Sequence, residues 1–180
     1  MSLHQSTSRI HLVSRSAPTR RVERDALLAA RGDANVLIVG ERGPVKAALA
    51  RFIHEQSDRS AQAFAALKCD RLSDELIRSE LFGGVDKPGV LTSAFRGTVL
   101  LDEIGALGAA TQDRLLRHLD ITERAIGGAR LIAATSVSLK AHAEAGLFHS
   151  ELYDRLSAVQ LVVPPQRERR NDIYELQVSA

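Results

Sequence analysis

A lysine and two glycines that follow a short apolar run are the first residues whose spacing suggests chemistry. The run ends at Gly40, and Gly43 and Lys46 follow it, at nearly the spacing of a phosphate-binding loop. In such a loop glycines let consecutive N–H groups curl around phosphate oxygens, and the lysine reaches the β- and γ-phosphates. The candidate phosphate-binding residues are Gly40, Glu41, Arg42, Gly43, Pro44, Val45, Lys46 and Ala47.

Three residues of this loop depart from the pattern. Val45 stands where the second motif glycine belongs, Ala47 has no hydroxyl for Mg²⁺, and Pro44 has no N–H to offer. If position 45 needs a positive φ, a β-branched residue there costs about 1–3 kcal/mol; if the loop relaxes instead, the phosphate cradle is lost. Both alternatives predict a weakened affinity for nucleotide.

Two acids, Asp102 and Glu103, end another apolar run. In P-loop NTPases the first acid holds Mg²⁺, and an adjacent glutamate orients or deprotonates the attacking water. Asp102 is therefore the candidate metal ligand and Glu103 the candidate base. The alternative is a solvated acidic strand end with no chemical role.

Short apolar runs alternate with helical patterns along the whole chain. The runs predict strands over residues 35–39, 64–67, 98–101, 130–134 and 159–163. The helical patterns cover residues 19–31, 45–57, 73–81, 109–119 and 139–156, and we expect the last helix to break near Gly146. This alternation is typical of βαβ units, so we predict an α/β fold: a five-stranded parallel sheet with helices on both faces and ligands beyond the carboxyl ends of its strands.

The length and composition set limits on the class of protein. A chain of 180 residues is long enough for one core, and we expect a lead-in over 1–13, one domain over 14–175 and a tail over 176–180. The single cysteine, Cys69, and the absence of a long apolar run or signal-like N-terminus favour a cytoplasmic protein. The net charge is only +2 and no aromatics interleave with the arginines, so we do not expect direct DNA binding. The histidines show no metal-ligand spacing, and we expect them at the surface.

Seven segments together resemble the AAA+ domain of bacterial sigma-54-dependent transcription activators. They are VLIVGERG (36–43), SELFG (79–83), GTVLLDEIG (97–105), QDRLLR (112–117), LIAAT (131–135), ELYDRL (151–156) and PPQRERRNDI (164–173). The resemblance implies the AAA+ form of the P-loop NTPase fold. It also implies that Lys46 contacts nucleotide phosphates, that Asp102 and Glu103 manage Mg²⁺ and water, and that Arg155 is offered to a neighbouring subunit's nucleotide.

Three further positions depart from the family pattern. The companion arginine position is His149, the sensor asparagine after the fourth strand is Ser136, and an asparagine that hydrogen-bonds the catalytic glutamate is replaced by Lys68. We expect Lys68 to pair with Glu103 and make it a poorer base. The sigma-54-contacting loop is reduced to residues 84–88, the hairpin over 119–130 is shortened, and we expect neither the family's helical lid nor its DNA-binding domain in these residues.

These departures favour a non-hydrolysing regulatory module that acts through protein contacts in transcription regulation, with Glu103 and Arg155 catalytically inactive. Its partner would be another AAA+ activator subunit, a transcription-machinery protein or a second copy of the chain. We expect ATP or ADP to bind weakly or not at all, and Mg²⁺ to depend on Asp102. The alternatives are an active ATPase that promotes sigma-54-dependent transcription and a small DNA-binding protein.

Overall fold

The computed structural model describes residues 17–84, 86–123, 128–165 and 167. The strands are β1 (Val36–Val39), β2 (Phe64–Lys68), β3 (Thr98–Asp102), β4 (Arg130–Thr135) and β5 (Val159–Val162). The helices are α1 (Ala17–Ala30), α2 (Val45–Glu55), α3 (Asp74–Phe82), α4 (Val90–Ser93), α5 (Ala109–Glu123), α6 (Leu139–Glu144) and α7 (Ser150–Leu156), with 3₁₀ turns η1 (Cys69–Arg71) and η2 (Ile104–Ala106). The predicted domain boundaries at 13/14 and 175/176 lie outside the described residues.

The five strands form one parallel sheet in the order β2-β3-β4-β1-β5. This confirms the predicted α/β architecture. The break expected near Gly146 within residues 139–156 is confirmed: Gly146 takes a φ of +71° between α6 and α7. The short helix α4 was not predicted, since its four residues carry too little pattern to stand out.

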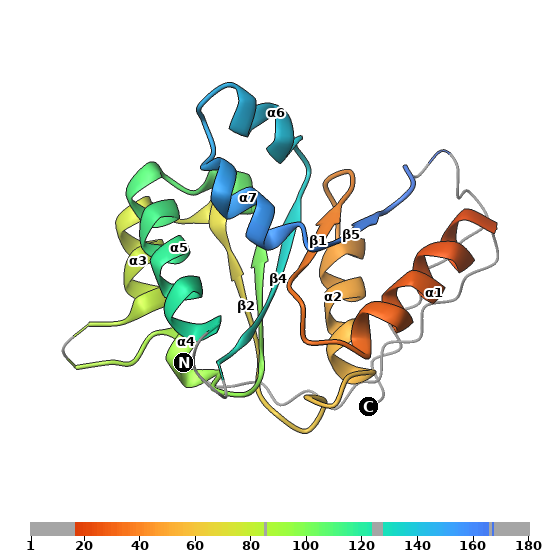
Figure 1. Ribbon diagram of the computed structural model, residues 1–180, viewed down its shortest axis with the longest axis horizontal. Coiled ribbons are helices and arrows are strands. Elements are labelled where there is room, and N and C mark those ends of the chain that lie inside the picture. Colours follow the sequence, from red (N-terminus) through yellow and green to blue (C-terminus); the bar gives the residue numbers. More distant parts are fainter. Residues whose placement is uncertain (1–16, 85, 124–127, 166, 168–180) are drawn as a thin grey trace.

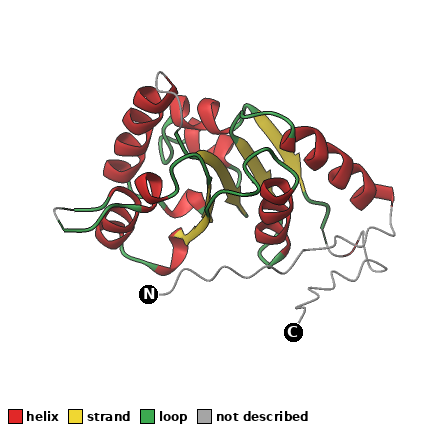
Figure 2. Cartoon of the chain, turned by 90° about the horizontal axis from the view of Figure 1, so that it is seen from below, coloured by secondary structure: helices red, strands yellow, loops and turns green. Residues whose placement is uncertain are grey.

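Helices cover both faces of the sheet (Figures 1 and 2). Within β1, Leu37 packs into a core shared with α3, α5 and α7, whereas Val36 and Ile38 pack into a second core with α1 and α2. Alternate strand residues point to opposite faces, so strands that are apolar throughout require helices on each side. Among the described residues no helix is long and apolar enough to cross a membrane.

Two arginines tie together the amino edge of the sheet, where the strands begin. Arg130 is 3% exposed and donates to the carbonyl oxygens of Ala29 and Ala34 at 2.7 and 3.0 Å. Arg59 donates to the carbonyl oxygens of Gly97 and Gly128 at 3.1 and 2.8 Å. Each guanidinium offers several donors in a fixed plane, so these side chains join the end of α1 to the loops that precede different strands.

His54 also lies at the amino edge and corrects the expectation that the histidines are at the surface. Its side chain is 4% exposed, and Nδ1 lies 2.9 Å from Oγ1 of Thr98. Burial lowers the pKa of His54, and the charge of nearby Arg51 lowers it further. The residue is therefore held neutral in the core, a placement that spacing between histidines does not reveal.

The carboxyl ends of the strands line up at the opposite edge. Val39 is in register with Thr135, and Lys68 with Asp102. The parallel register therefore brings the loop after β1 and the residues after β3 and β4 to one edge of the sheet, as predicted for a ligand site.

Candidate nucleotide site

The loop between β1 and α2 passes directly into a helix. Pro44 has helical dihedral angles of −74° and −13°, and Val45 is the first residue of α2. Among the described non-glycine residues, only Arg96 and Glu103 have a positive φ, so Val45 carries no left-handed strain. Its side chain is buried in the core beneath α2. The alternative in which Val45 is strained by a positive φ is therefore wrong.

The backbone itself requires glycine at two positions of the loop, Gly40 and Gly43. Gly43 has a φ of +151°, in a region that other residues rarely adopt. A Cβ on Gly40 would lie 2.8 Å from Cβ of Val163 on the neighbouring strand end. Both glycines are therefore required by the fold, whether or not a phosphate binds.

Lys46 is the most deeply buried charged side chain of the site. It is 1% exposed, and its Nζ lies 2.9 Å from the carbonyl oxygen of Glu41 and 3.0 Å from Oε1 of Glu103. A buried ammonium needs such a partner, because leaving it unpaired costs several kcal/mol. The lysine expected to reach phosphate is thus bound to the candidate base.

Glu103 is turned toward this lysine by its own backbone. It has left-handed dihedral angles of 55° and 50°, which end β3. Its Oε2 accepts hydrogen bonds from the backbone N–H and the hydroxyl of Ser136, at 3.0 and 2.7 Å. Burial alone raises the pKa of Glu103, but hydrogen bonds from Ser136 and Lys46 outweigh it and the pKa is lowered.

Asp102 has the opposite electrostatic setting. Burial raises the pKa of its carboxyl group, the charge of Lys46 opposes that rise, and the charge of Glu103 adds to it. The described residues contain no group of three or more histidine, cysteine, aspartate or glutamate side chains that would hold a metal ion. Ala47 lacks a hydroxyl, so the predicted site offers Mg²⁺ the Asp102 carboxylate without a hydroxyl ligand beside it, and the remaining oxygen ligands would come from water and phosphate.

The remaining polar residues of the loop face solvent. Glu41 pairs with Arg167 at 3.3 Å, and Arg42 pairs with Asp70 at 3.4 Å. Exposed ion pairs of this kind contribute little to stability. They leave the Lys46–Glu103 pair as the main electrostatic feature of the site.

The predicted Lys68–Glu103 contact is wrong. Lys68 is exposed, and no ion pair within 4 Å joins these two described residues. Lys68 is in register with Asp102 and its charge lowers the pKa of that acid, whereas Glu103 lies beyond the strand and is turned toward Ser136. The register of β2 and β3 therefore places Lys68 beside Asp102 and not beside Glu103.

Arg155 does not join this cluster. Its Nη2 lies 2.9 Å from Oδ1 of Asp120 on α5 and 3.5 Å from Oε1 of Glu151 on α7. His149 is the N-cap residue that precedes α7, and its N–H donates to Oε1 of Gln112 at 2.8 Å. The structure thus gathers Gly40, Gly43, Lys46, Asp102 and Glu103, and places Arg155 in an ion pair between α5 and α7.

Ser136 is the site residue that sequence reasoning missed as a partner of Glu103. The sequence did contain a signal for this contact. Ser136 is a short polar residue directly after β4, and β4 is the neighbour of β3, the strand that leads into Asp102 and Glu103. The hydrogen bonds also depend on the left-handed turn at Glu103, and no residue type in the sequence announces that turn.

The chain matches the family described as the sigma-54 interaction domain over residues 12–162. It is 38% identical over 179 residues to the response regulator protein PilR of Pseudomonas aeruginosa, covering 90% of this chain and 40% of PilR. It is 37% identical over 185 residues to the Nif-specific regulatory protein of Klebsiella pneumoniae, covering 92% of this chain and 35% of that protein. The chain therefore spans two fifths or less of the length of these relatives.

Solved structures agree with this assignment. NtrX from Brucella abortus in complex with ADP superposes with a TM-score of 0.85 at 30% identity, over 91% of this chain and 40% of NtrX. The P-loop NTPase domain of a sigma-54 activator from E. coli superposes with a TM-score of 0.64 at 19% identity, over 85% of this chain and 99% of that domain, and supports the fold alone. The chain belongs to the sigma-54 interaction domain family and has its AAA+ P-loop fold.

Proposed function

We propose that this chain is a non-hydrolysing member of the family, which acts in transcription regulation through contacts with other proteins. The observation that carries the proposal is the pairing of Lys46 with Glu103, supported by the two hydrogen bonds from Ser136. In this arrangement the cation expected at the phosphates and the base expected at the attacking water neutralise each other.

A base held in this way is poorly suited to activate water. Proton transfer needs a free lone pair directed at the water and a pKa near the working pH. Oε1 of Glu103 faces Lys46, Oε2 accepts from Ser136, and the pKa is lowered. Glu103 is therefore a structural acceptor in this state.

Nucleotide affinity is expected to be weak for three reasons. First, a phosphate must displace the Glu103 carboxylate from Lys46. Second, the Val45 side chain is packed in the hydrophobic core between the sheet and α2, which fixes the loop there. Third, Pro44 offers no N–H to a phosphate oxygen. Mg²⁺ would find the Asp102 carboxylate but no hydroxyl at position 47. The metal that normally assists phosphoryl transfer would then be held weakly.

The α7 edge is the surface through which we propose contact with another AAA+ subunit, whether an activator or a second copy. The Arg155 side chain is 30% exposed there and pairs with Asp120; in the proposed contact it would bind a phosphate or carboxylate of the partner instead. To reach a neighbour it must leave Asp120, so this contact competes with an existing ion pair.

The second candidate function is an active ATPase that promotes sigma-54-dependent transcription. It is favoured by the resemblance to NtrX, which has been solved in complex with ADP and with ATP. It requires nucleotide binding to break the Lys46–Glu103 pair and to free Glu103 for water.

A titration with a fluorescent ATP analogue, with and without Mg²⁺, tests the state of the site. We expect no saturation in the micromolar range for the natural chain. Val45→Gly with Ala47→Ser should tighten binding by about tenfold, and adding Lys46→Met should remove that gain. Micromolar binding by the natural chain would favour the ATPase reading.

A mixing experiment tests the partner. The chain is titrated into an ATP-hydrolysing sigma-54 activator domain, and the steady-state ATPase rate of that domain is measured. We expect a dose-dependent change that Arg155→Ala removes and Arg71→Ala, at an exposed control position, keeps. An unchanged rate at excess chain would argue against contact through α7.

A further inference from the structure

We propose that a groove between α4 and α5 binds an acidic segment of a partner protein through one large apolar side chain of that segment. The groove encloses about 450 Å³. Its lining residues, here called the α4–α5 groove, are Phe82, Leu91, Thr92, Arg114, Arg117, His118 and Ile121. None of them belongs to the candidate nucleotide site, so the proposal is independent of the proposed function.

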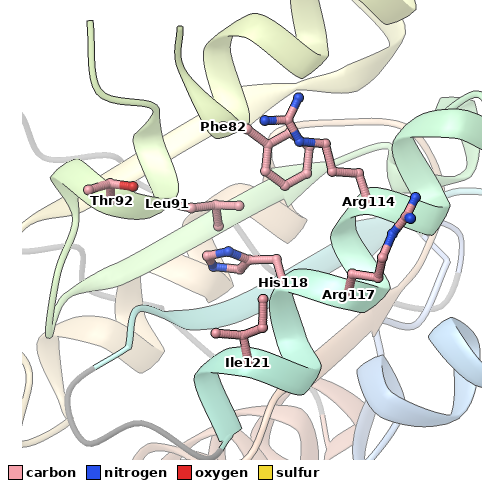
Figure 3. A pocket seen from close by; sticks show the side chains of 7 residues that line it. All are labelled: Phe82, Leu91, Thr92, Arg114, Arg117, His118 and Ile121. Atoms are coloured by element: carbon pink, nitrogen blue, oxygen red, sulfur yellow. The ribbon is translucent and has the colours of Figure 1, made fainter. Parts of the chain in front are cut away.

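The floor of the groove is apolar. Figure 3 shows Phe82, Leu91 and Ile121 around the hollow, with His118 between them. Leu91 is 4% exposed, whereas Ile121 is 68% exposed. A buried floor with an exposed apolar margin is the form expected of a site that accepts a side chain from another molecule.

Two guanidinium groups of α5 stand beside this floor. Arg114 stacks over the ring of Phe82 with its Cζ 4.4 Å from the ring centroid, and Nε of Arg117 donates to the carbonyl oxygen of Asp113 at 3.3 Å. Across the described residues neither guanidinium has a carboxylate within 4 Å, unlike Arg42, Arg59 and Arg155. The groove therefore carries positive charge that the described residues leave uncompensated.

The stacking prepares Arg114 for an anionic ligand. A guanidinium placed over an aromatic ring still has N–H donors to offer, and these match a carboxylate in a two-point contact. His118 lies with its ring centroid 6.2 Å from that of Phe82, and burial lowers its pKa. It adds a polar ring to the groove rather than a third charge.

The occupant is better matched by a protein segment than by a small molecule or a nucleic acid. Two apolar side chains at the groove are exposed: Ile121, which lines it, at 68%, and Phe95, whose N–H donates to the carbonyl oxygen of the lining residue Thr92, at 60%. An apolar margin of this extent suits a peptide anchor with flanking residues. The charge selects aspartate and glutamate as those flanking residues. Single-stranded nucleic acid instead stacks its bases on free aromatic faces, and Arg114 already lies over the ring of Phe82.

Selection from a phage-displayed library of random dodecapeptides on the immobilised chain tests this proposal. The expected peptides carry aspartate or glutamate beside leucine, isoleucine or an aromatic residue. In fluorescence anisotropy with a selected peptide, Arg114→Glu and Ile121→Asp should each weaken binding by about tenfold or more. Thermal unfolding of both variants confirms that they remain folded, as expected for exposed positions.

The matched control is Arg51→Glu. Arg51 stacks on Phe64 with its Cζ 4.6 Å from the ring centroid, in the same kind of pair but on α2. Peptide affinity should be unchanged in this variant. The proposal is overturned if no peptide is enriched or if the enriched peptides lack acidic residues. It is also overturned if Arg114→Glu binds the peptides as the natural chain does. Binding of single-stranded DNA that Arg114→Glu weakens, with no peptide bound, would overturn it as well.

Discussion

The two edges of the sheet each contain a buried cation, but the cations have different partners. At the amino edge Arg130 donates to main-chain carbonyl oxygens of Ala29 and Ala34. At the carboxyl edge Lys46 is bound to the side chain of Glu103 as well as to a carbonyl oxygen. A carbonyl cannot be protonated or turned away without moving the chain, whereas a carboxylate can exchange its partner.

This difference separates a structural role from a switchable one. The arginines of the amino edge hold strand-initiating loops at fixed distances, and no ligand would gain by displacing them. The lysine of the carboxyl edge is held by a group whose partner can change, so the same burial leaves it open to competition by phosphate. The predictions below test that contrast.

The largest effect is expected at the amino edge for Arg130→Ala. The carbonyl oxygens of Ala29 and Ala34 each lose the Arg130 donor, although Ala29 keeps the N–H of Gly32. A nearly buried side chain also leaves a cavity, so the free energy of unfolding should fall by about 4 kcal/mol. Urea denaturation measures it. Arg71→Ala, at an exposed position, should change it by about 0.5 kcal/mol or less; similar losses in the two variants would contradict the structural role.

At the carboxyl edge, Glu103→Ala should cost less, about 2 kcal/mol, because it leaves the Lys46 ammonium with only carbonyl contact. This is below the cost for a fully buried pair, since the Glu103 side chain is 12% exposed. Adding Lys46→Met should recover most of the loss, which a double-mutant cycle measures. Additive losses would show that the two side chains do not stabilise each other.

Ser136→Ala removes the hydroxyl donor to Glu103 and leaves the backbone donor in place. We expect a loss of about 1 kcal/mol in the free energy of unfolding. Because the hydroxyl favours the charged carboxylate, the pKa of Glu103 should rise, and a carbon-13 NMR titration follows it. Ser93→Ala on α4 serves as the control. An unchanged pKa of Glu103 in Ser136→Ala would show that the Ser136 hydroxyl does not stabilise the Glu103 carboxylate.

The smallest effect is a pH dependence at the amino edge. The pKa of His54 is lowered by burial, so between that pKa and the ordinary 6.5 the unfolded chain binds a proton that the folded chain does not. The free energy of unfolding should therefore rise with pH through this window and level off above it. His54→Gln should flatten the slope in part, since His118 shifts in the same direction; an unaltered slope would contradict the neutral, buried His54.

Apolar runs and their alternation with helical patterns predicted the strands and the parallel sheet, because burial on both faces leaves a continuous apolar signature. The position of Lys46 beside the acids also follows from strand order in such sheets. The partner of Glu103 could not be predicted, since it depends on the left-handed backbone of that residue. The short helix α4 and the α4–α5 groove likewise arise from packing between segments that are separate in sequence.

Steady-state phosphate release by the purified chain, at saturating ATP and with Mg²⁺, tests the central claim most directly. The account predicts a rate equal to that of the Glu103→Ala variant, because Glu103 already serves as the acceptor for Lys46 and Ser136. Sustained release that Glu103→Ala abolishes would contradict it and would identify the chain as an active ATPase.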